Sequence, residues 1–295
     1  MEQTTPQQPT ETDGAWKPRS KVEEVAATIN IPSQPKVMQD INLEFNKEDI
    51  DFGKIGELIR RDVSLSAKIV KVANSPLFRR RKSIESIDHA LLILGRIQFQ
   101  QTILASALRQ TLEGHGREMD QFWAHSESMG LICDVIARQF QPDLAGYAYM
   151  VGLFHDCAVP ILMDRSSEYN TLVPRVLARD RLVSNEEEVV GEIDHASLGM
   201  AMTRSWSVPI PITKAVMAHH SDDFLVHDDP TTTRLHVILA IAENYYLYSR
   251  RAENEIFQPV TPNPWLLTAI EVATGWSKHR IDGLSAVLDK RFSDI

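Results

Sequence analysis

The sequence predicts an all-α protein, and three observations carry this prediction. Apolar residues recur every three or four positions through almost the whole chain, which is the period of a helix with one buried face. No run alternates apolar and polar residues for long enough to predict a β-strand. Several helical runs stop at glycine, at Asn-Ser or at proline, which commonly end helices. With 295 residues, 43% of them hydrophobic, the chain is long enough to bury a large helical core.

The N-terminal 22 residues are rich in Thr, Gln and Pro and have no apolar core of their own. This composition predicts a disordered tail and excludes a secretory signal. No apolar run approaches the ~20 residues needed to span a bilayer. Cys133 and Cys157 lie within apolar helical runs, which indicates unpaired thiols in a reducing compartment. We therefore expect a cytoplasmic protein without a membrane span.

The net charge of −9 argues against broad nucleic-acid binding, which needs a basic surface. One local exception is a basic run in "FRRRKS", formed by Arg79, Arg80, Arg81 and Lys82. Such a run is usually a solvated loop, and a docking site for an acidic partner or a phosphate is the alternative. The sequence leaves the role of these four residues open.

Residues 23–112 are predicted to form the helices of an N-terminal lobe. The apolar stripes of its early helices are formed by Ile55 and Ile59 and by Leu65 and Ile69. The second of these helices ends at Asn74-Ser75-Pro76, because proline cannot continue a helix. The next one begins near Ser86, which stands before Asp88 in an imperfect capping pattern, and stops at Gly95. A further helix is expected from about Ile97 to Leu112.

The polar, glycine-bearing residues 113–120 are the predicted boundary between two lobes. Residues 113–256 are expected to form a second helical lobe, followed by two short helical segments within residues 257–295. In the second lobe Asp194 stands where it can cap the N-terminus of a helix that begins at His195.

Titratable residues lie on the apolar faces of these helices. His125 shares a stripe with Phe122 and Met129, and His155 with Asp156 interrupts an apolar run, residues 150–162, that we expect to be one core helix. A single histidine on such a face is usually a core residue with a satisfied hydrogen bond. Five histidines and two carboxylates on five successive helices favour one shared metal site, because each buried group would otherwise need its own partner. The candidate ligands are His125, His155, Asp156, His195, His219, His220 and Glu243.

Mixed imidazole and carboxylate ligands suit iron, manganese or zinc better than calcium. The expected cofactor is therefore one or two divalent ions of this kind. The remaining histidines fall outside the candidate set and are expected to be ordinary residues: His89, His115, His227, His236 and His279.

Three segments carry a resemblance to a known family: "INIPSQPKVMQDI", "IGELIRRDVSLSAKIVKVANSPLF" and "SIESIDHALLILG". Their Pro-x-x-Pro opening, Asn-Ser turn and Leu-Gly helix end resemble the N-terminal part of the HDOD family. The later order of histidine, His-Asp and acidic residue resembles the HD superfamily of metal-dependent phosphohydrolases. The resemblance covers Ile31 to about Tyr246. It implies a two-lobed helical HDOD architecture with an HD-like helical core.

By position, the resemblance assigns the candidate ligands to two sets. His125, His155, Asp156 and Glu243 match the single-metal HD set. The extra ligands of the two-metal HD-GYP branch are matched by His195, His219 and His220, with Asp156 as the bridging carboxylate.

The sequence departs from the HD-GYP pattern at three places. Cys157-Ala158-Val159 stand where that branch has a Gly-Lys, so the lysine expected to meet a substrate phosphate is missing. The segment "HHSDDF" is not followed by Gly-Tyr-Pro. The last acidic residue is Glu243 instead of Asp, and its extra methylene moves the carboxylate by roughly 1.5 Å.

Two functions from different classes follow. One is a bacterial signal-transduction module that acts through a protein partner or a small ligand. Its histidines would hold a structural metal or be vestigial. The sequence is also compatible with a homo-oligomer. The alternative is a metal-dependent phosphohydrolase acting on a nucleotide or phosphodiester, in which Asp156 is the catalytic residue. The filled ligand set favours the hydrolase, whereas the missing lysine and Gly-Tyr-Pro favour the signalling module.

Overall fold

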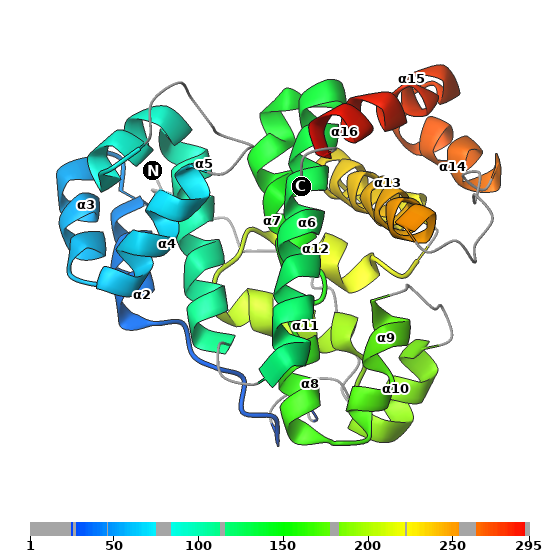
Figure 1. Ribbon diagram of the computed structural model, residues 1–295, viewed down its shortest axis with the longest axis horizontal. Helices are drawn as coiled ribbons and strands as arrows, with labels where there is room; N and C mark the ends of the chain where they lie inside the picture. Colours follow the sequence, from blue (N-terminus) through cyan, green and yellow to red (C-terminus); the bar gives the residue numbers. More distant parts are fainter. Residues whose placement is uncertain are drawn as a thin grey trace, which may run out of the picture.

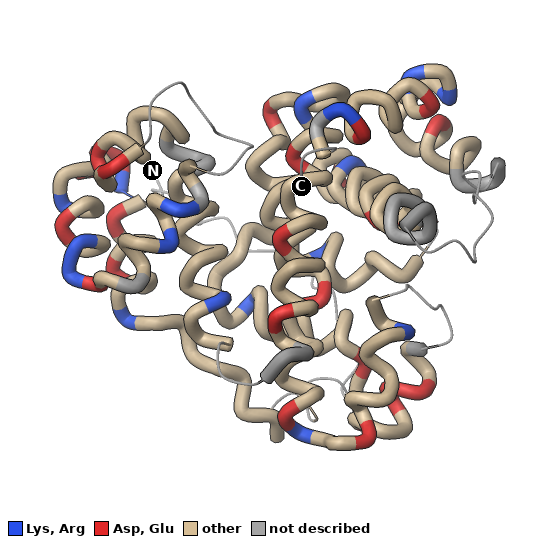
Figure 2. The backbone as a smooth tube through the Cα atoms, in the orientation of Figure 1, with Lys and Arg blue, Asp and Glu red and all other residues tan. Residues whose placement is uncertain are grey.

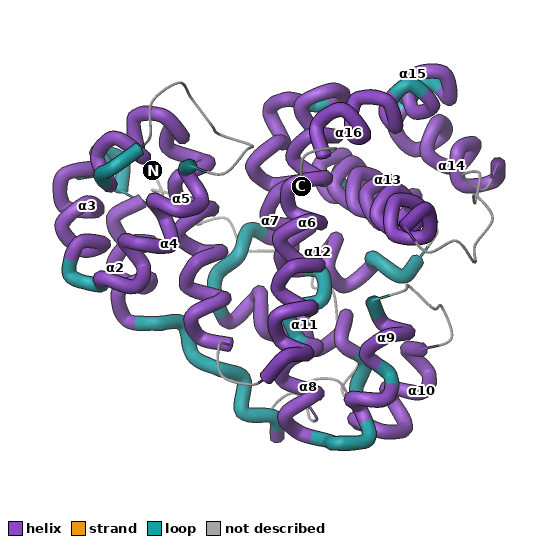
Figure 3. The backbone as a smooth tube through the Cα atoms, viewed as in Figure 1, coloured by secondary structure: helices purple, strands orange, loops and turns teal. Residues whose placement is uncertain are grey.

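The computed structural model describes residues 25, 28–45, 47–74, 84–112, 116–177, 183–221, 223–253 and 264–292. This part of the chain consists of helices and connecting loops and contains no strand (Figures 1 and 3). The all-α prediction is therefore confirmed. The predicted tail and the basic run at Arg79 to Lys82 lie outside the described residues. No helix in the described ranges is long and apolar enough to cross a membrane.

The N-terminal helices form a group on the left of Figure 1. They are α2 (Lys36–Phe45), α3 (Phe52–Arg60), α4 (Val63–Ala73) and the first half of α5 (Ile87–Leu112). Asn74, directly after α4, donates a hydrogen bond from Nδ2 to the carbonyl oxygen of Ile84 (2.7 Å) and accepts one from the Ile84 N–H (2.8 Å). Asn74 thus ties the end of α4 to the chain just before α5.

Helix α5 joins the two groups of helices. Ser86 caps its N-terminus, since the His89 N–H donates to Ser86 Oγ (3.1 Å). The predicted stop is present, because Gly95 has φ of 71° and breaks the helical backbone in a region that favours glycine. Beyond Gly95 the helix resumes, and residues 101–108 are all buried. A helix buried on every side packs between neighbours on every side, which here include α7.

The second group is built on α6 (Gly116–Phe140) and α7 (Ala145–Phe154), which pack along each other in the centre of Figure 1. The other helices around them are α8 (Val159–Arg165), α9 (Val173–Val176), α10 (Val183–Gly191), α11 (His195–Ser205), α12 (Ile210–Ala218) and α13 (Pro230–Glu253). Residues 116–120 of the predicted boundary form the first turns of α6, because Met119, Phe122 and Trp123 are buried on one face. The division into lobes at residues 113–120 remains a prediction.

The C-terminal helices α14 (Pro264–Thr274), α15 (Lys278–Asp282) and α16 (Leu284–Phe292) lie beside α13 and α6 at the upper right of Figure 1. Acidic and basic residues are interspersed along the helices of both groups (Figure 2). The segment before α2 reaches the second group, where Trp206 Nε1 donates to the carbonyl oxygen of Pro32 (2.8 Å). This contact fixes the end of α11 against the start of the N-terminal group.

Candidate metal centre

His155 and Asp156 lie in a turn between two helices. Helix α7 ends at Phe154 and α8 begins at Val159, with Pro160 in its first turn. The expectation of one continuous core helix over residues 150–162 is therefore wrong. Proline has no N–H to donate to a preceding helical turn, so it favours the start of a new helix. The turn lets two consecutive side chains face the same interior, which a straight helix does not allow.

The Asp156 carboxylate lies at the centre of the histidine cluster. Its Oδ2 is 3.1 Å from His155 Nε2 and 3.5 Å from His125 Nε2. The other oxygen, Oδ1, is 3.3 Å from His195 Nε2 and 3.4 Å from His219 Nε2. All five side chains are buried. One carboxylate therefore faces two separate pairs of imidazoles, one pair at each oxygen.

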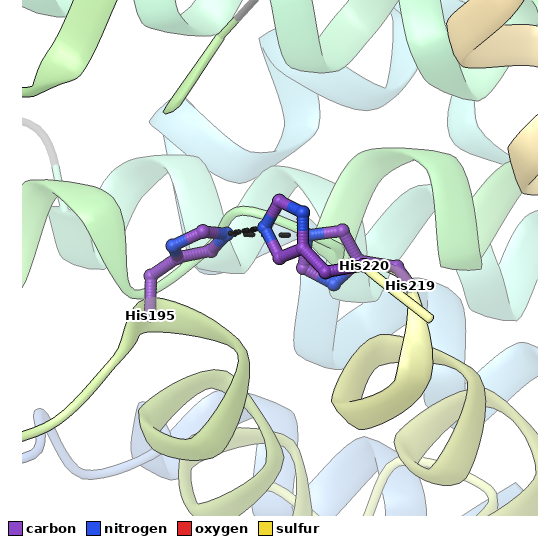
Figure 4. Close-up of side chains that lie close together, drawn as sticks. All are labelled: His195, His219 and His220. Carbon is purple, nitrogen blue, oxygen red and sulfur yellow. Dashed lines mark hydrogen bonds between the residues drawn. The ribbon is translucent and has the colours of Figure 1, made fainter. Parts of the chain in front are cut away.

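The possible ligand atoms fall into two sets of three. The α6–α7 group consists of His125, His155 and Asp156. The α11–α12 group consists of His195, His219 and His220. In Figure 4, His195 approaches from one side and the two consecutive histidines from the other. The structure thus brings six of the seven candidate ligands together, whereas their role as metal ligands stays a prediction.

The local structure explains why the second set converges. Asp194 caps α11 as predicted: its Oδ1 accepts from the Ser197 N–H (2.8 Å). This places His195 in the first turn of α11, where its side chain is not covered by a preceding helical turn. His219 and His220 stand just after the last residue of α12. Helices α11 and α12 pack against each other, so the start of one meets the end of the other.

Hydrogen bonds at the outer nitrogens orient three of the rings. His155 Nδ1 is 2.7 Å from the carbonyl oxygen of Gly152, and His219 Nδ1 is 2.6 Å from that of Val216. Because a carbonyl oxygen only accepts, both Nδ1 atoms carry a hydrogen, and in the neutral rings Nε2 presents its lone pair to the centre. His195 Nδ1 similarly lies 2.7 Å from each carboxylate oxygen of Glu187.

The spacing of the inner nitrogens fits cation binding. The Nε2 atoms of His125 and His155 are 3.4 Å apart, and His195 Nε2 is 3.1 Å from that of His219 and 2.8 Å from that of His220. Lone pairs aimed at one another repel unless a proton or a cation lies between them. Nitrogen ligands about 2.0–2.1 Å from one ion lie about 2.8–3.4 Å from each other, the shorter distance for an octahedral and the longer for a tetrahedral ion. The residues of each group therefore fit a divalent cation, and Asp156 faces both groups.

The buried charges perturb the ionisation of these groups. Burial alone would raise the pKa of Asp156, but the imidazoles of His155, His125 and His195 hold it well below its ordinary value. Burial opposes the charged form of His195, yet Asp156 and Glu187 together raise the pKa of His195 to about 10. For His125, burial outweighs the nearby carboxylates and lowers the pKa. Burial also opposes the charged form of His155, but Asp156 and Glu243 raise its pKa, so of these three histidines His125 is the one for which burial prevails.

Glu243 lies close to this cluster but outside both groups. It is buried on α13 and lines a pocket with His125, His155, Asp156 and His220. The other lining residues are Val176, Leu177, Tyr246 and Leu247. The Tyr246 ring packs edge-on against His125, with ring centroids 4.7 Å apart. Ligation by Glu243 remains a prediction.

Glu187 and Tyr169 were not identified from the sequence. Glu187, on α10, is fully buried against His195, and the Tyr169 hydroxyl donates to Glu187 Oε1. Glu187 is one of three consecutive glutamates, Glu186 to Glu188, which resemble a solvated run. The sequence feature that could have identified Glu187 as buried is its position three residues before Val190, which places it on the more apolar face of the predicted helix.

The fold and this cluster define a helical domain built around a buried, histidine-rich centre with one central aspartate. The family model described as HDOD domain matches residues 31–222. The chain therefore belongs to the HDOD domain family, and the resemblance seen in the sequence is confirmed.

Solved structures share the fold. A Geobacter sulfurreducens HDOD domain protein of unknown function is 24% identical, with 93% of this chain and 94% of that chain covered and a TM-score of 0.71. A Shewanella amazonensis SB2B protein provisionally described as a phosphohydrolase is 20% identical, with coverage of 92% and 94% and a TM-score of 0.70. At this level of identity the likeness shows the fold alone.

Among curated proteins, an uncharacterized protein of Treponema pallidum (strain Nichols) is 22% identical over 194 residues. The match covers 65% of this chain and 38% of that protein. The uncharacterized protein YuxH of Bacillus subtilis (strain 168) is 30% identical over 113 residues, or 38% of this chain and 27% of the relative. The chain therefore spans well under half the length of these two relatives.

Proposed function

We propose that this chain is a signal-transduction module whose helical core is held together by divalent iron, manganese or zinc, with one ion in each group. The position of Asp156 carries this proposal. One carboxylate faces imidazoles from α6, from the turn after α7, from α11 and from the end of α12. A bridge between four elements makes their mutual packing depend on whether the centre is filled.

Each residue has a defined part in this arrangement. Asp156 supplies one oxygen to each group, and the rings of His155 and His219 are held by backbone carbonyl oxygens so that Nε2 faces inward. When bound, the cations supply the positive charge that lets several imidazoles lie together in a buried space. A change in filling would be transmitted through the elements that Asp156 faces to the pocket that a small ligand enters or to the surface that a protein partner contacts.

The lining of the pocket favours binding over hydrolysis. Phosphoryl transfer relies on cationic side chains, as well as metal ions, to stabilise charge in the transition state. No lysine or arginine lines the pocket among the residues that the structure describes. Where the HD-GYP branch carries its lysine, this chain has Ala158 and Val159, both fully buried.

One observation favours the phosphohydrolase alternative. The pocket reaches members of both groups, since His125, His155, Asp156 and His220 all line it. A small phosphodiester could therefore meet both positions at once. In that case bound cations would lower the pKa of a water molecule, and Asp156 would hold the two positions together.

The test is metal analysis of protein purified without a histidine tag, combined with a hydrolysis assay on cyclic dinucleotides. We expect up to two divalent ions per chain and negligible hydrolysis. Metal-dependent hydrolysis that disappears in Asp156→Ala would replace the signalling proposal with the hydrolase. Protein that binds none of the three metals would contradict both.

A further inference from the structure

The outer partner of His195 differs in kind from those of His155 and His219. Those two rings bond to backbone carbonyl oxygens, which are neutral acceptors present in any helix. His195 bonds to the Glu187 carboxylate, and both carboxylate oxygens lie 2.7 Å from His195 Nδ1. Glu187 comes from a separate helix, α10, so its contact with His195 is a tertiary one.

The buried position of Glu187 carries a desolvation penalty. Its side chain is fully buried, and an isolated carboxylate in such surroundings would be strongly destabilising. The structure surrounds it with donors: the ring and backbone N–H of His195 and the hydroxyl of Tyr169, which is itself fully buried. A charged group held in this way at the back of one histidine indicates a role tied to that histidine.

We propose that Glu187 and Tyr169 are positioning residues that fix His195 with Nε2 toward Asp156 and make the α11–α12 group the tighter of the two cation sites. This inference rests on the proposed metal centre. A carboxylate that accepts from the outer nitrogen of a histidine fixes the ring and increases its basicity as a ligand. The described part of the α6–α7 group has no such carboxylate behind either imidazole.

Tyr169 acts one step further out. Its hydroxyl donates to Oε1 of Glu187, one of the two oxygens that face His195 Nδ1. This bond keeps the carboxylate from rotating away from the ring. Tyr169 lies in the short 3-10 turn Tyr169–Thr171, which packs against α10, so the arrangement is set by the fold of this region.

The test compares three variants of the full chain. Glu187→Gln removes the charge at nearly constant shape, and Tyr169→Phe removes only the hydroxyl. The matched control is Glu186→Gln, because Glu186 is the preceding residue on α10, is exposed, and pairs with Arg175. Calorimetric titration with Zn²⁺ is expected to give a tight and a weaker step in the wild type.

In Glu187→Gln the tight step should weaken about 10–100-fold while the weaker step is unchanged. Tyr169→Phe should give a smaller loss in the same step, and Glu186→Gln should match the wild type. If the tight step is unchanged in Glu187→Gln, or if both steps weaken equally, the inference is wrong. Tyr169→Phe provides the same decision should Glu187→Gln fold poorly.

A second readout does not need the cation. A histidine Nδ1–H bonded to a carboxylate gives a strongly downfield proton signal, so NMR of the cation-free protein should show one from His195. The signal should move upfield in Glu187→Gln and remain in Glu186→Gln. If the wild type binds no Zn²⁺, the metal centre and the tighter-site claim fail together, and this signal alone decides whether Glu187 positions His195.

Discussion

The two halves of the histidine cluster use the same residue types and the same aspartate, but their surroundings differ. In the α6–α7 group, His125 has no hydrogen-bond partner at Nδ1 among the described residues and packs against the Tyr246 ring. In the α11–α12 group, His195 and His219 are almost completely buried and each is held at Nδ1. Both imidazoles of the α6–α7 group also line the pocket with Glu243.

If each group binds a cation, as proposed above, this difference in surroundings suits the two groups to different roles. A ring fixed by a buried carboxylate cannot move without losing that bond, so the α11–α12 group suits a permanent structural ion. In the α6–α7 group, His155 is held at Nδ1 by the Gly152 carbonyl oxygen, but the His125 ring has no hydrogen bond at Nδ1 among the described residues. Because that ring can adjust its orientation at little cost, the α6–α7 group suits an ion that exchanges or responds to a ligand in the pocket. We expect signalling changes to arise in the α6–α7 group.

The largest effect is expected for Asp156→Ala, because the Asp156 carboxylate faces histidines of both groups. The change leaves four buried imidazoles without their common counter-charge. The free energy of unfolding should fall by about 3–5 kcal/mol, as when one partner of a buried ion pair is removed. Urea unfolding followed by circular dichroism measures this.

The control for that experiment is Asp228→Ala. Asp228 is exposed and pairs with Lys214 at the surface (2.8 Å), so its loss should leave the free energy of unfolding close to that of the wild type. Metal content should fall in both groups for Asp156→Ala and stay constant for Asp228→Ala. Loss of only one ion from Asp156→Ala would show that the two halves are independent.

A smaller and one-sided effect is expected for Gly152→Ala. A methyl group at this position would lie 2.5 Å from the carbonyl oxygen of Met129, so α7 would have to move away from α6. Because the Gly152 carbonyl also accepts from His155, the α6–α7 group should lose its ion while the α11–α12 group keeps its own. Overpacking of this kind costs about 1–3 kcal/mol.

Thermal unfolding and metal content of Gly152→Ala are compared with those of Gly283→Ala. At Gly283 the nearest atoms to an added methyl group lie 3.6 Å away, so no clash is expected. Unchanged metal content in Gly152→Ala would mean that the geometry of His155 does not depend on the close approach of α6 and α7.

The sequence predicted the helices and much of the cluster, because both rest on local signals. Gly95 breaks the helix through its own backbone preference, whereas Asn74 holds the end of α4 and Asp194 caps α11 through their side chains. Histidines on apolar faces point inward in any helical packing, so their convergence followed from periodicity. The turn at His155 was missed because the apolar run outweighed the signal from Pro160.

Glu187 and Glu243 are two residues whose positions relative to the histidines could not be predicted from local sequence patterns. The contact of Glu187 with His195 depends on how α10 docks against the start of α11, which no spacing within the sequence reveals. Glu243 was chosen from its position on an apolar helix face and from the order of residues in the family, yet it lines the pocket outside both groups of ligand atoms. The distance between a helix face and a metal position is a tertiary property.

The smallest effect on stability and Zn²⁺ binding is expected from substitutions of His236, which supports the segment that carries His219 and His220. His236, fully buried on α13, lies 3.0 Å through Nε2 from the carbonyl oxygen of Ser221, the residue that follows His220. Its Nδ1 is 3.1 Å from His227 Nε2. Because the Ser221 carbonyl only accepts, His236 donates there, and this bond helps to hold the end of the segment that carries His219 and His220.

Two substitutions of His236 distinguish the contribution of this hydrogen bond from that of side-chain packing. His236→Leu removes the donor, whereas His236→Gln keeps an N–H that can reach the same carbonyl oxygen. We expect His236→Leu to lower stability by about 1 kcal/mol and to weaken Zn²⁺ binding a few-fold in the tight step only, with His236→Gln close to the wild type. A larger loss in the weaker step would reverse the comparison, since the α6–α7 group would then be the one that depends on support from α13.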